Sequence, residues 1–450
     1  MANLIGARIE RKEDKKFLTG KGRYTADINL PKQTYAYFVR SPHARAKITK
    51  VDHSKAMKAP GVIDIFTGDC VAKDKIGGLI CGWKIVSQDG KDMKCPPHPV
   101  LAKDSVNFVG DHVAVVVAET LEQAKNAAEL VNVGYKIQKA VIKTEEATSF
   151  ENIHEGIDNN LSFDFLLGDK GKTDEAFSKA DKIVKLDIVN NRLIPNAMEP
   201  RAAIGDYNTS SDELTLYTAS QNPHLDRLIM SAFNAVHPEH KFRIVAPDVG
   251  GGFGSKINVY AEDVVVAYAS KKIGRPVKWV AERSESFMSD NHGRDHVTHA
   301  ELAVSNDGKM IGIKVDTIAN LGAYSLVLAA VTPTYLYAPL LLGIYDIPTA
   351  CCTVKGVYTN TAPTDAYRGA GRPEATYVIE RIVTEAAKEI GMDQAEFRKK
   401  NFINKFPHQQ CLVHNIDSGD YNAHLDKAIE LADYKNFENR RSQSSKKGKL

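Results

Sequence analysis

The sequence feature that most strongly restricts how this chain can fold is a set of four glycines in the five positions 250–254. They lie inside the segment PDVGGGFGSK (247–256). It follows the strand-like segment KFRIVA and precedes the helix-like segment NVYAEDVVVAYASKKIG. Glycine tolerates positive φ and lets the backbone approach a ligand closely. Successive N–H groups in such a loop, with a helix N-terminus behind them, can form an anion-binding nest. The pattern predicts a strand, a loop and a helix in succession, with the loop acting either as a tight structural turn or as a binding site.

The spacing of these glycines excludes two common nucleotide-binding loops. A Walker loop requires GxxxxGK followed by Ser or Thr, and a dinucleotide-binding loop requires GxGxxG with an acidic residue about 20 positions later. The segment 250–256 matches neither pattern. Phe253 within the loop would place an aromatic ring beside whatever the loop binds.

The first part of the chain mixes strand-like and helix-like segments without strict alternation, which is typical of an α+β protein. The segments 35–41 and 112–119 are predicted strands, because they alternate or are rich in β-branched residues. Residues 121–133 have helical spacing, with Thr120 as the expected N-cap. The segment around 139–168 is polar and is expected to bury little, so we predict a connector there.

The second part repeats this mixture. Strands are expected in KADKIVKLDIVN, DELTLYTASQ and RPVKWVAE, and a hairpin is expected with its turn at 306–308. The amphipathic segment 373–391 predicts a helix that ends at a glycine. From about residue 420, a helical segment leads into the polar, basic tail RSQSSKKGKL. That helix has nothing downstream to pack on, which favours a truncated chain or split subunit over a disordered natural tail.

Composition limits the classes of partner. The chain has 59 Lys and Arg against 56 Asp and Glu, so neither nucleic acid nor an anionic membrane is expected as the main partner. No apolar run is long enough for a membrane span, and the first residues lack the apolar region of a signal peptide. We therefore expect a cytoplasmic protein. The six cysteines form no C-x-x-C pair, so we expect reduced thiols and no iron–sulfur cluster in this chain.

Three motifs identify the chain as similar to a known family. They are TASQNPH (218–224), GGGFGSK (250–256) and TDAYRGAGRPE (364–374), and they occur in the order seen in that family. The segments GARIERKEDKKFLTGKGRYTADINLP and VRSPHARAKI also resemble its N-terminal region. The family is the molybdopterin-binding large subunits of the xanthine dehydrogenase, aldehyde oxidase and aerobic carbon monoxide dehydrogenase superfamily. The resemblance covers essentially the whole chain, and the third motif looks like the form II variant.

The resemblance implies an α+β fold with a defined domain order. An N-terminal extension (1–19) would precede an α/β-hammerhead domain (20–138), and the connector (139–168) would lead to the first molybdopterin-binding domain (169–405). Residues 406–450 would begin a second, truncated molybdopterin-binding domain.

The resemblance also implies a cofactor and partners. The cofactor would be molybdopterin cytosine dinucleotide, in which a pterin dithiolene holds Mo, while the protein binds and orients the group. An iron–sulfur subunit, with an FAD subunit as a second candidate, would pass electrons, because no cluster or flavin is expected in this chain. The substrate would be a small molecule.

The family's site residues carry over to matching positions of this sequence. Gln221 would place its amide against a terminal oxo ligand of Mo, donating a hydrogen bond without adding charge. Phe253 would flank the metal, and Arg368 would present a fork of donors to oxygens. Taken singly, they could equally be a solvated loop residue, an aromatic plug in the core and a surface salt bridge. The cofactor-binding set is Gln221, Gly251, Gly252, Phe253, Gly254, Arg368, Gly369 and Ala370. Gln221, Phe253 and Arg368 are expected near Mo, not as side-chain ligands.

Two positions depart from better-defined members. Carbon monoxide dehydrogenases of the best-defined type carry a cysteine that bridges copper to Mo where this chain has Gly369, so no copper is expected. Purine-oxidising members carry a glutamate where this chain has Ile257. The preferred function is therefore oxidation of an aldehyde or N-heterocycle with water as the oxygen source. The alternatives are a carbon monoxide dehydrogenase-like large subunit and a non-catalytic cofactor-binding fragment.

The family's general base is a glutamate in a GxGE-type motif near the C-terminus of a longer chain. These 450 residues contain no such motif, so no catalytic residue is expected within them. We expect little or no turnover from this chain alone, unless a separate polypeptide supplies the missing half.

Overall fold

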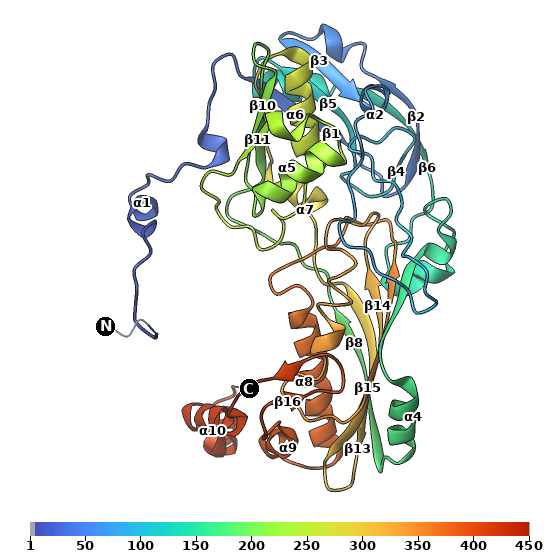
Figure 1. The fold of residues 1–450 in the computed structure, drawn as a ribbon, viewed down its shortest axis with the longest axis vertical. Helices are drawn as coiled ribbons and strands as arrows, with labels where there is room; N and C mark the ends of the chain where they lie inside the picture. The colour runs from blue at the N-terminus through green and yellow to red at the C-terminus, as the bar shows by residue number, and fades with distance from the viewer. Residues whose placement is uncertain (1–4, 450) are drawn as a thin grey trace.

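A seven-stranded mixed sheet forms the centre of one lobe of the computed structural model, which describes residues 5–449. Figure 1 shows this lobe above a second one. The strand order is β11-β10-β9-β12-β1-β5-β3. In chain order these strands are β1 (Thr34–Arg40), β3 (Val62–Thr67), β5 (His112–Ala118), β9 (Ala202–Asn208), β10 (Glu213–Thr218), β11 (Phe242–Val245) and β12 (Val277–Val280).

This sheet joins strands from two regions that are far apart in the sequence. β1 runs parallel to β12, with Thr34 opposite Val277, and antiparallel to β5. The strands share one apolar core, in which Phe38 lies edge-on to Trp279 with ring centroids 5.9 Å apart. The region before residue 138 and the region after residue 169 are therefore held together by one continuous sheet.

Helices and a smaller sheet complete the upper lobe. α6 (Ala261–Ile273) packs against β9, and residues 261–270 of this helix are all buried. It ends at Gly274, whose φ of 66° is the left-handed conformation that glycine adopts without strain. The other elements are α2 (Gly68–Lys73), α3 (Leu121–Ala128), α5 (Pro223–Ala232), α7 (Arg283–Ser289) and the three-stranded sheet of β2 (Ala46–Asp52), β4 (Ser105–Val106) and β6 (Asn132–Ile137).

A five-stranded sheet with the order β7-β15-β14-β13-β8 forms the lower lobe. The predicted hairpin is confirmed, since β13 and β14 pair antiparallel and Gly308 in the turn has a φ of 83°. Figure 1 shows α8 on one face of this sheet and α4 on the other. The elements are β7 (Leu161–Gly168), α4 (Lys170–Ser178), β8 (Lys182–Asn190), β13 (His296–Val304), β14 (Met310–Asn320), β15 (Ala350–Val357) and α8 (Arg372–Glu389).

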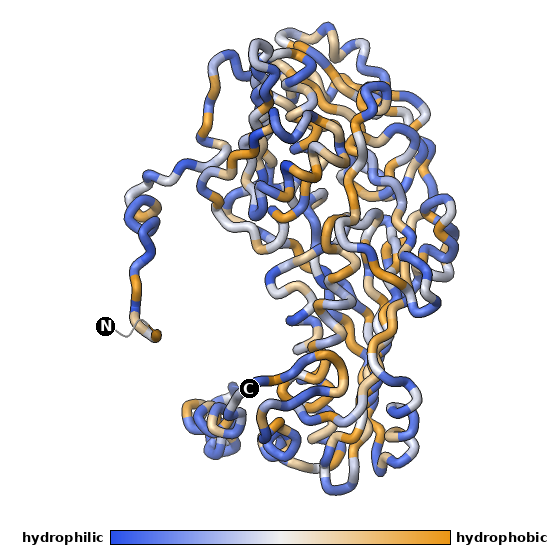
Figure 2. The backbone as a smooth tube through the Cα atoms, in the orientation of Figure 1, coloured by the Kyte–Doolittle hydropathy of each residue, from blue (hydrophilic) through white to orange (hydrophobic). Residues whose placement is uncertain are grey.

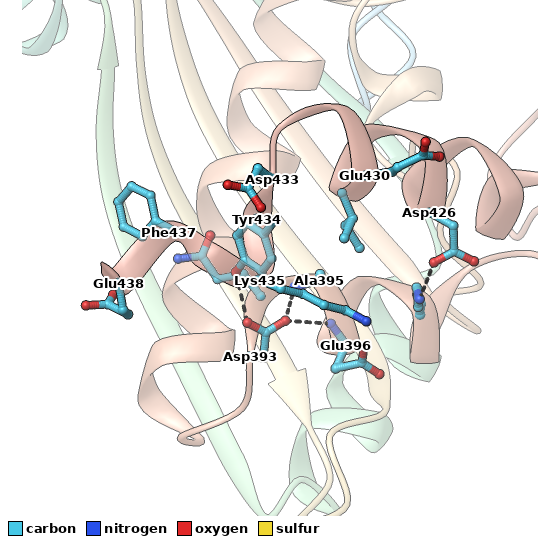
Figure 3. A pocket seen from close by; sticks show the side chains of 13 residues that line it. Asp393, Ala395, Glu396, Asp426, Glu430, Asp433, Tyr434, Lys435, Phe437 and Glu438 are labelled. Atoms are coloured by element: carbon cyan, nitrogen blue, oxygen red, sulfur yellow. Dashed lines mark hydrogen bonds and ion pairs between the residues drawn. The ribbon is translucent and has the colours of Figure 1, made fainter. Parts of the chain in front are cut away.

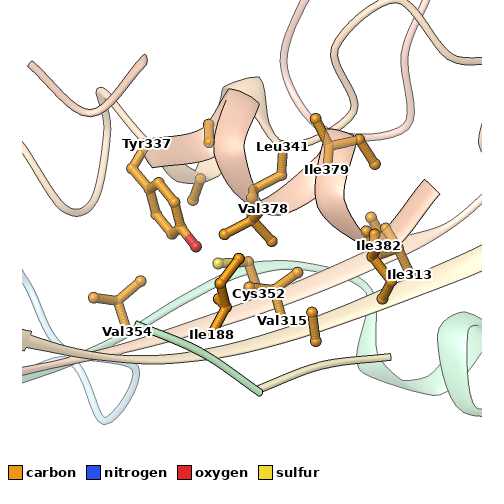
Figure 4. Close-up of a cluster of buried hydrophobic side chains, with 14 of the residues drawn as sticks. Ile188, Ile313, Val315, Tyr337, Leu341, Cys352, Val354, Val378, Ile379 and Ile382 are labelled. Atoms are coloured by element: carbon orange, nitrogen blue, oxygen red, sulfur yellow. The ribbon is translucent and has the colours of Figure 1, made fainter. Parts of the chain in front are cut away.

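The core of the lower lobe lies between this sheet and α8. Figure 4 shows Val378, Ile379 and Ile382 of α8 above side chains of the sheet, with Tyr337 packed beside them. The alternation of apolar residues along the strands and their helical spacing in α8 bury these side chains together. Figure 2 shows apolar segments running through the interiors of both lobes.

Two local expectations are wrong. The connector was expected to bury little, but β7 lies within it and Val141, Ile153 and Ile157 are buried in the core of the lower lobe. The helix predicted over 121–133 ends at residue 128, because residues 132–137 pair with β2 as β6. The polar tail contributes no buried residue, as expected, and its first six residues belong to α11 (Phe437–Lys446).

The last part of the chain contains α9 (Gln394–Asn401), the short strands β16 (His408–Gln409) and β17 (Asn415–Ile416), α10 (Tyr421–Leu431) and α11. A cleft of about 1030 Å³ lies between α9 and these C-terminal helices (Figure 3). Tyr434 donates to Asp393 across it at 2.8 Å, and Lys399 pairs with Asp426 at 2.6 Å. None of the residues that line this cleft belongs to the three sequence motifs.

The N-terminal extension leaves the body of the molecule, with the short α1 (Asp14–Leu18) in its middle (Figure 1). It is attached at the start of the glycine segment, where Asp248 accepts from Lys16 Nζ at 2.5 Å and from the Arg23 N–H at 2.7 Å. Within residues 5–449, no helix has both the length and the apolar character needed to cross a membrane.

Candidate functional site

The three motifs converge on one exposed surface at the base of the upper lobe. Gln221 follows β10, the glycine segment follows β11, and β10 and β11 are parallel neighbours, so both loops leave the same edge of the sheet. The third loop, before α8, reaches them through a hydrogen bond from the Arg368 N–H to the Phe253 carbonyl at 3.0 Å. The side chains of Gln221, Phe253 and Arg368 are all exposed.

The amide of Gln221 has a fixed orientation. Its Oε1 accepts the N–H of Gly254 at 2.9 Å and that of Lys256 at 3.4 Å, while its own N–H donates to the Lys256 carbonyl at 2.7 Å. Because two backbone donors point at one side-chain atom, that atom must be the oxygen. The Nε2 group is left with no hydrogen bond to the residues that the structure describes, so two donors remain free.

The glycine segment presents its backbone amides. Gly251, Phe253 and Gly254 have φ values of 95°, 55° and 106°, which glycine adopts readily and phenylalanine only under constraint. Among residues 5–449, no partner is found for the N–H groups of Gly251, Gly252 and Phe253. These three successive donors form a nest open to one side.

Two expectations about this loop are corrected. The helix was expected directly behind the loop, but α6 begins only at Ala261 and its N-terminus is capped by the Tyr260–Asp263 capping box. The nest therefore consists of loop amides without the helix terminus. The Gly254 N–H was expected to face the cofactor, but it is buried and already donates to Gln221.

The third loop is a tight turn. Gly369, Ala370 and Gly371 have φ values of 100°, 44° and 83°, which brings the chain into α8 within four residues. The guanidinium of Arg368 lies 5.7 Å above the Phe253 ring. No hydrogen bond joins this guanidinium to any described residue, so its five donors remain available.

The backbone of this turn is held from behind by a buried arginine. Arg294 donates to the carbonyls of Tyr367 at 2.9 Å and Arg368 at 2.8 Å, and it pairs with Glu374 at 2.9 Å. Glu374 lies in the first turn of α8 and is buried as the partner of Arg294.

Sequence reasoning missed the residues beneath the glycine segment. Glu199 accepts the Gly250 N–H at 2.7 Å and pairs with Lys256 Nζ at 2.7 Å. Burial lowers the pKa of Lys256, although the hydrogen bond and charge of Glu199 oppose this shift. Lys256 is the last residue of the motif GGGFGSK, but no local sequence pattern reveals that its ion-pair partner lies 57 positions away.

A network of buried charges lies one layer deeper. Arg201 donates to Glu262 at 2.9 Å and to Asp290 at 2.6 Å, with its guanidinium 3.7 Å above the Tyr260 ring. Arg40 also pairs with Glu262, at 2.8 Å. Burial alone would raise the pKa of Glu262, but these arginines and a neighbouring histidine outweigh it and hold the pKa well below its usual range.

A polar cavity of about 10 Å³, roughly the size of one water, lies behind the Gln221 loop. Asp226 of α5 borders it and accepts a short hydrogen bond from Ser220, while its Oδ1 has no partner among the described residues. Burial raises the pKa of Asp226 to about 8, although the hydrogen bond from Ser220 opposes the shift. The carboxyl of Asp226 is therefore mostly protonated at neutral pH.

Comparison with known proteins matches both parts of the chain. A model of the molybdopterin cofactor-binding domain matches residues 153–402, and a model of the a/b hammerhead domain of aldehyde oxidase and xanthine dehydrogenase matches residues 19–139. The chain belongs to the xanthine dehydrogenase and aldehyde oxidase family of molybdopterin-binding subunits. The predicted α+β fold, a hammerhead domain followed by a molybdopterin-binding domain, is thereby confirmed.

Relatives within this family are named for different reactions. The chain is 36% identical over 444 residues to a carbon monoxide dehydrogenase large chain from Hydrogenophaga pseudoflava, covering 94% of this chain and 53% of that one. It is 31% identical to a nicotine 6-hydroxylase large subunit from Paenarthrobacter nicotinovorans, covering 99% and 54%. Among solved structures, quinoline 2-oxidoreductase from Pseudomonas putida 86 matches with a TM-score of 0.92 at 29% identity, covering 98% and 56%. The chain thus spans about half the length of these relatives.

Proposed function

We propose that the three loops bind the molybdopterin cofactor, and that the chain is the part of a molybdenum hydroxylase large subunit that holds one side of it. The observation that carries this proposal is the shared orientation of free donors. The N–H groups of Gly251, Gly252 and Phe253, the Nε2 group of Gln221 and the guanidinium of Arg368 lie on converging loops and have no hydrogen-bond partners among residues 5–449. A surface of this kind suits an anionic group rich in oxygen.

The residues at this site fit a metal that is held by an organic cofactor and not by protein side chains. Within residues 5–449 there is no group of three or more His, Cys, Asp or Glu able to hold a metal ion. A Cβ on Gly252 would lie 2.3 Å from Gln221 Oε1, so the loop approaches as closely as it does only because no side chain is present there. The three loops would therefore contribute hydrogen-bond donors and a surface of matching shape, while the pterin dithiolene of the cofactor would hold Mo.

The side chains have separate roles in this proposal. The cofactor, when bound, supplies the two-electron oxidation of a carbon centre with water as the source of the added oxygen. Gln221 would hold the cofactor by donating through Nε2 to one of its oxygens, Arg368 would add a positive charge, and the half-exposed Phe253 ring would form an apolar wall. Gly251, Gly252, Gly369 and Ala370 let the backbone come close, and Gly254 acts indirectly by orienting the Gln221 amide.

The substrate we propose is an aldehyde or an aromatic N-heterocycle. The relatives named for nicotine and quinoline support this choice, as does the flat Phe253 face beside the donors. We also propose the cytosine dinucleotide form of the cofactor, a cytoplasmic location, and electron transfer to an iron–sulfur subunit, with an FAD subunit as a further partner. A related subunit of a 6-hydroxypseudooxynicotine dehydrogenase complex supports multi-subunit assembly.

Carbon monoxide oxidation is the second candidate, favoured by similarity to the Hydrogenophaga protein. The turn at Gly369 argues against a copper ligand there. Its φ is 100°, and a Cβ would lie 2.5 Å from Cγ of Pro373, so a cysteine would require the turn to rearrange. We therefore expect the loaded protein to contain Mo without copper.

Cofactor content tests the proposal directly. Gln221→Glu keeps the oxygen that accepts the Gly254 N–H but replaces the free donors with a negative charge. We expect the purified wild-type chain, produced in a host that makes the cofactor, to contain Mo and pterin, and the variant to contain about tenfold less, as for loss of a charge-complementary contact. Gln443→Glu, at an exposed position of α11, is the matched control. Equal Mo and pterin in all three proteins, or none in the wild type, would contradict the proposal.

We further propose that these 450 residues alone show little or no turnover, because they contain no GxGE-type glutamate. A non-catalytic cofactor-binding fragment remains the alternative that the same assay addresses. Mo-dependent hydroxylation of an aldehyde or N-heterocycle by the pure chain would contradict the expectation of inactivity.

A further inference from the structure

Glu199 makes an unusual number of contacts with the glycine segment. Its N–H donates to the Gly250 carbonyl at 3.2 Å, and its Oε2 accepts the Gly250 N–H at 2.7 Å. Lys256 Nζ donates both to Oε2, at 2.7 Å, and to the Glu199 carbonyl, at 3.0 Å. One residue therefore holds both ends of the loop that runs from Gly250 to Lys256.

The ion pair between Glu199 and Lys256 is buried, which strengthens its hold on the loop. The Lys256 side chain is 1% exposed and that of Glu199 is 11% exposed, so the pair is largely shielded from water. A Cβ on Gly250 would lie 2.5 Å from Cβ of Glu199, which shows how closely the two segments pack.

The loop between these two ends needs such restraint. Phe253 holds a φ of 55°, a left-handed backbone conformation that is strained for a residue with a side chain. The three free N–H groups lie between the ends and have no partners of their own among the described residues. A loop with strain and open donors keeps one conformation only if its ends are fixed.

Glu199 is in turn fixed from the other side. The Arg283 guanidinium donates to the carbonyls of Ala197 at 2.7 Å and Met198 at 3.0 Å, and Arg201, two residues later, enters the buried charge network. The irregular segment 197–201, which precedes β9, is thus anchored on both sides of Glu199.

We propose that Glu199 is a positioning residue for cofactor binding, which fixes the glycine loop by accepting the Gly250 N–H and neutralising Lys256. It acts through the loop and does not itself contact the cofactor. The effect on cofactor binding rests on the proposed function. The contacts by which Glu199 fixes the glycine loop, here called the clamp, belong to the protein without cofactor.

Two uncharged double variants separate the clamp from general stability. E199M/K256M removes the buried charges and the acceptor, while E199Q/K256M removes the charges and keeps an oxygen for the Gly250 N–H. Replacing a buried ion pair with uncharged side chains of similar size is often neutral for folding. The two proteins should therefore unfold at similar temperatures, and E301Q, which removes one carboxylate of a pair on β13, serves as an outside control.

The measurement is amide hydrogen exchange at Gly250 and Gly254 in the full chain. We expect exchange about tenfold faster in E199M/K256M than in E199Q/K256M, including at Gly254, which donates to Gln221 and does not touch Glu199. Mo and pterin content should fall in the first variant and be largely kept in the second. Equal exchange at Gly254 in both double variants, or a change no larger than in E301Q, would overturn the clamp. Absence of Mo and pterin from the wild type would overturn the proposed function and leave the exchange result to decide the clamp.

Discussion

At the scale of single residues, the candidate site depends on close approach between Gln221 and the glycine loop. The Gln221 side-chain oxygen accepts hydrogen bonds from the Gly254 and Lys256 N–H groups, and this leaves its amide nitrogen free to donate. The sequence motifs predicted which residues meet, and the structure brings Gln221, Phe253 and Arg368 together as expected. The motifs could not predict that Gly254 serves Gln221, because that depends on which way an amide turns.

Gly252→Ala tests the close approach. The added Cβ would lie 2.3 Å from Gln221 Oε1, so the glutamine must swing away and lose its hydrogen bond to Gly254. The fold should lose only about 1 kcal/mol of unfolding free energy, the worth of one hydrogen bond, while Mo and pterin content falls severalfold. Elemental analysis and pterin fluorescence measure the content. Gly171→Ala is the control, because its Cβ would meet only Asp169 Oδ1 at 3.6 Å; equal content in the two variants would refute the close-packing argument.

Asp226 makes the stability of the molecule depend on pH. Its pKa is about 8 in the folded protein, raised chiefly by burial, and about 4 in an unfolded chain. Because the folded state holds the proton more tightly, the stability from this group is complete below pH of about 4 and is lost as the pH rises towards about 8.

Asp226→Asn imitates the protonated form and should remove this dependence. We expect the unfolding temperature of the variant to fall less than that of the wild type between pH 5 and pH 9, and to exceed it at the alkaline end. Thermal unfolding across this pH range measures the difference. Parallel curves for the two proteins would show that the Asp226 carboxyl is not kept protonated by burial.

At the scale of helices and strands, the sequence predicted most elements that have a regular apolar pattern. The strands β1 and β5, the hairpin of β13 and β14, and α8 lie where their periodicity places them. The wrong predictions occur where pairing with a strand distant in the sequence decides the secondary structure. Residues 132 and 133 leave the predicted helix because they pair with β2, and β7 forms within the polar connector because β15 pairs with it. Neither partner is visible in the local pattern of residues.

The junction of β1 with β12 predicts that the two parts of the upper lobe unfold together. Trp279, 2% exposed, lies at this junction, while Trp83 is 55% exposed, so Trp83→Phe leaves one buried fluorescent reporter. We expect its emission and the exchange protection of β5 amides to be lost at the same urea concentration, because both belong to one core. β5 amides that stay protected after the emission has shifted would contradict the shared core.

At the scale of the whole molecule, the donors all lie on one exposed surface, while the cleft of about 1030 Å³ between α9 and the C-terminal helices lies elsewhere. The resemblance of the three motifs to those of the family, in the same order along the chain, predicted the family. The buried support could not be predicted, since Glu199, Arg201 and Arg294 find partners far away in the sequence. Domain boundaries at 138, 168 and 405 stay predictions.

The position of Mo relative to these loops tests the central claim most directly. Anomalous diffraction at the Mo absorption edge, from crystals of protein produced with the cofactor, locates the metal without assumptions about the surrounding density. We predict a single peak beside the Gln221 amide nitrogen and the Arg368 guanidinium, with the Phe253 ring alongside. A Mo peak on any other surface of a well-loaded protein would contradict the account.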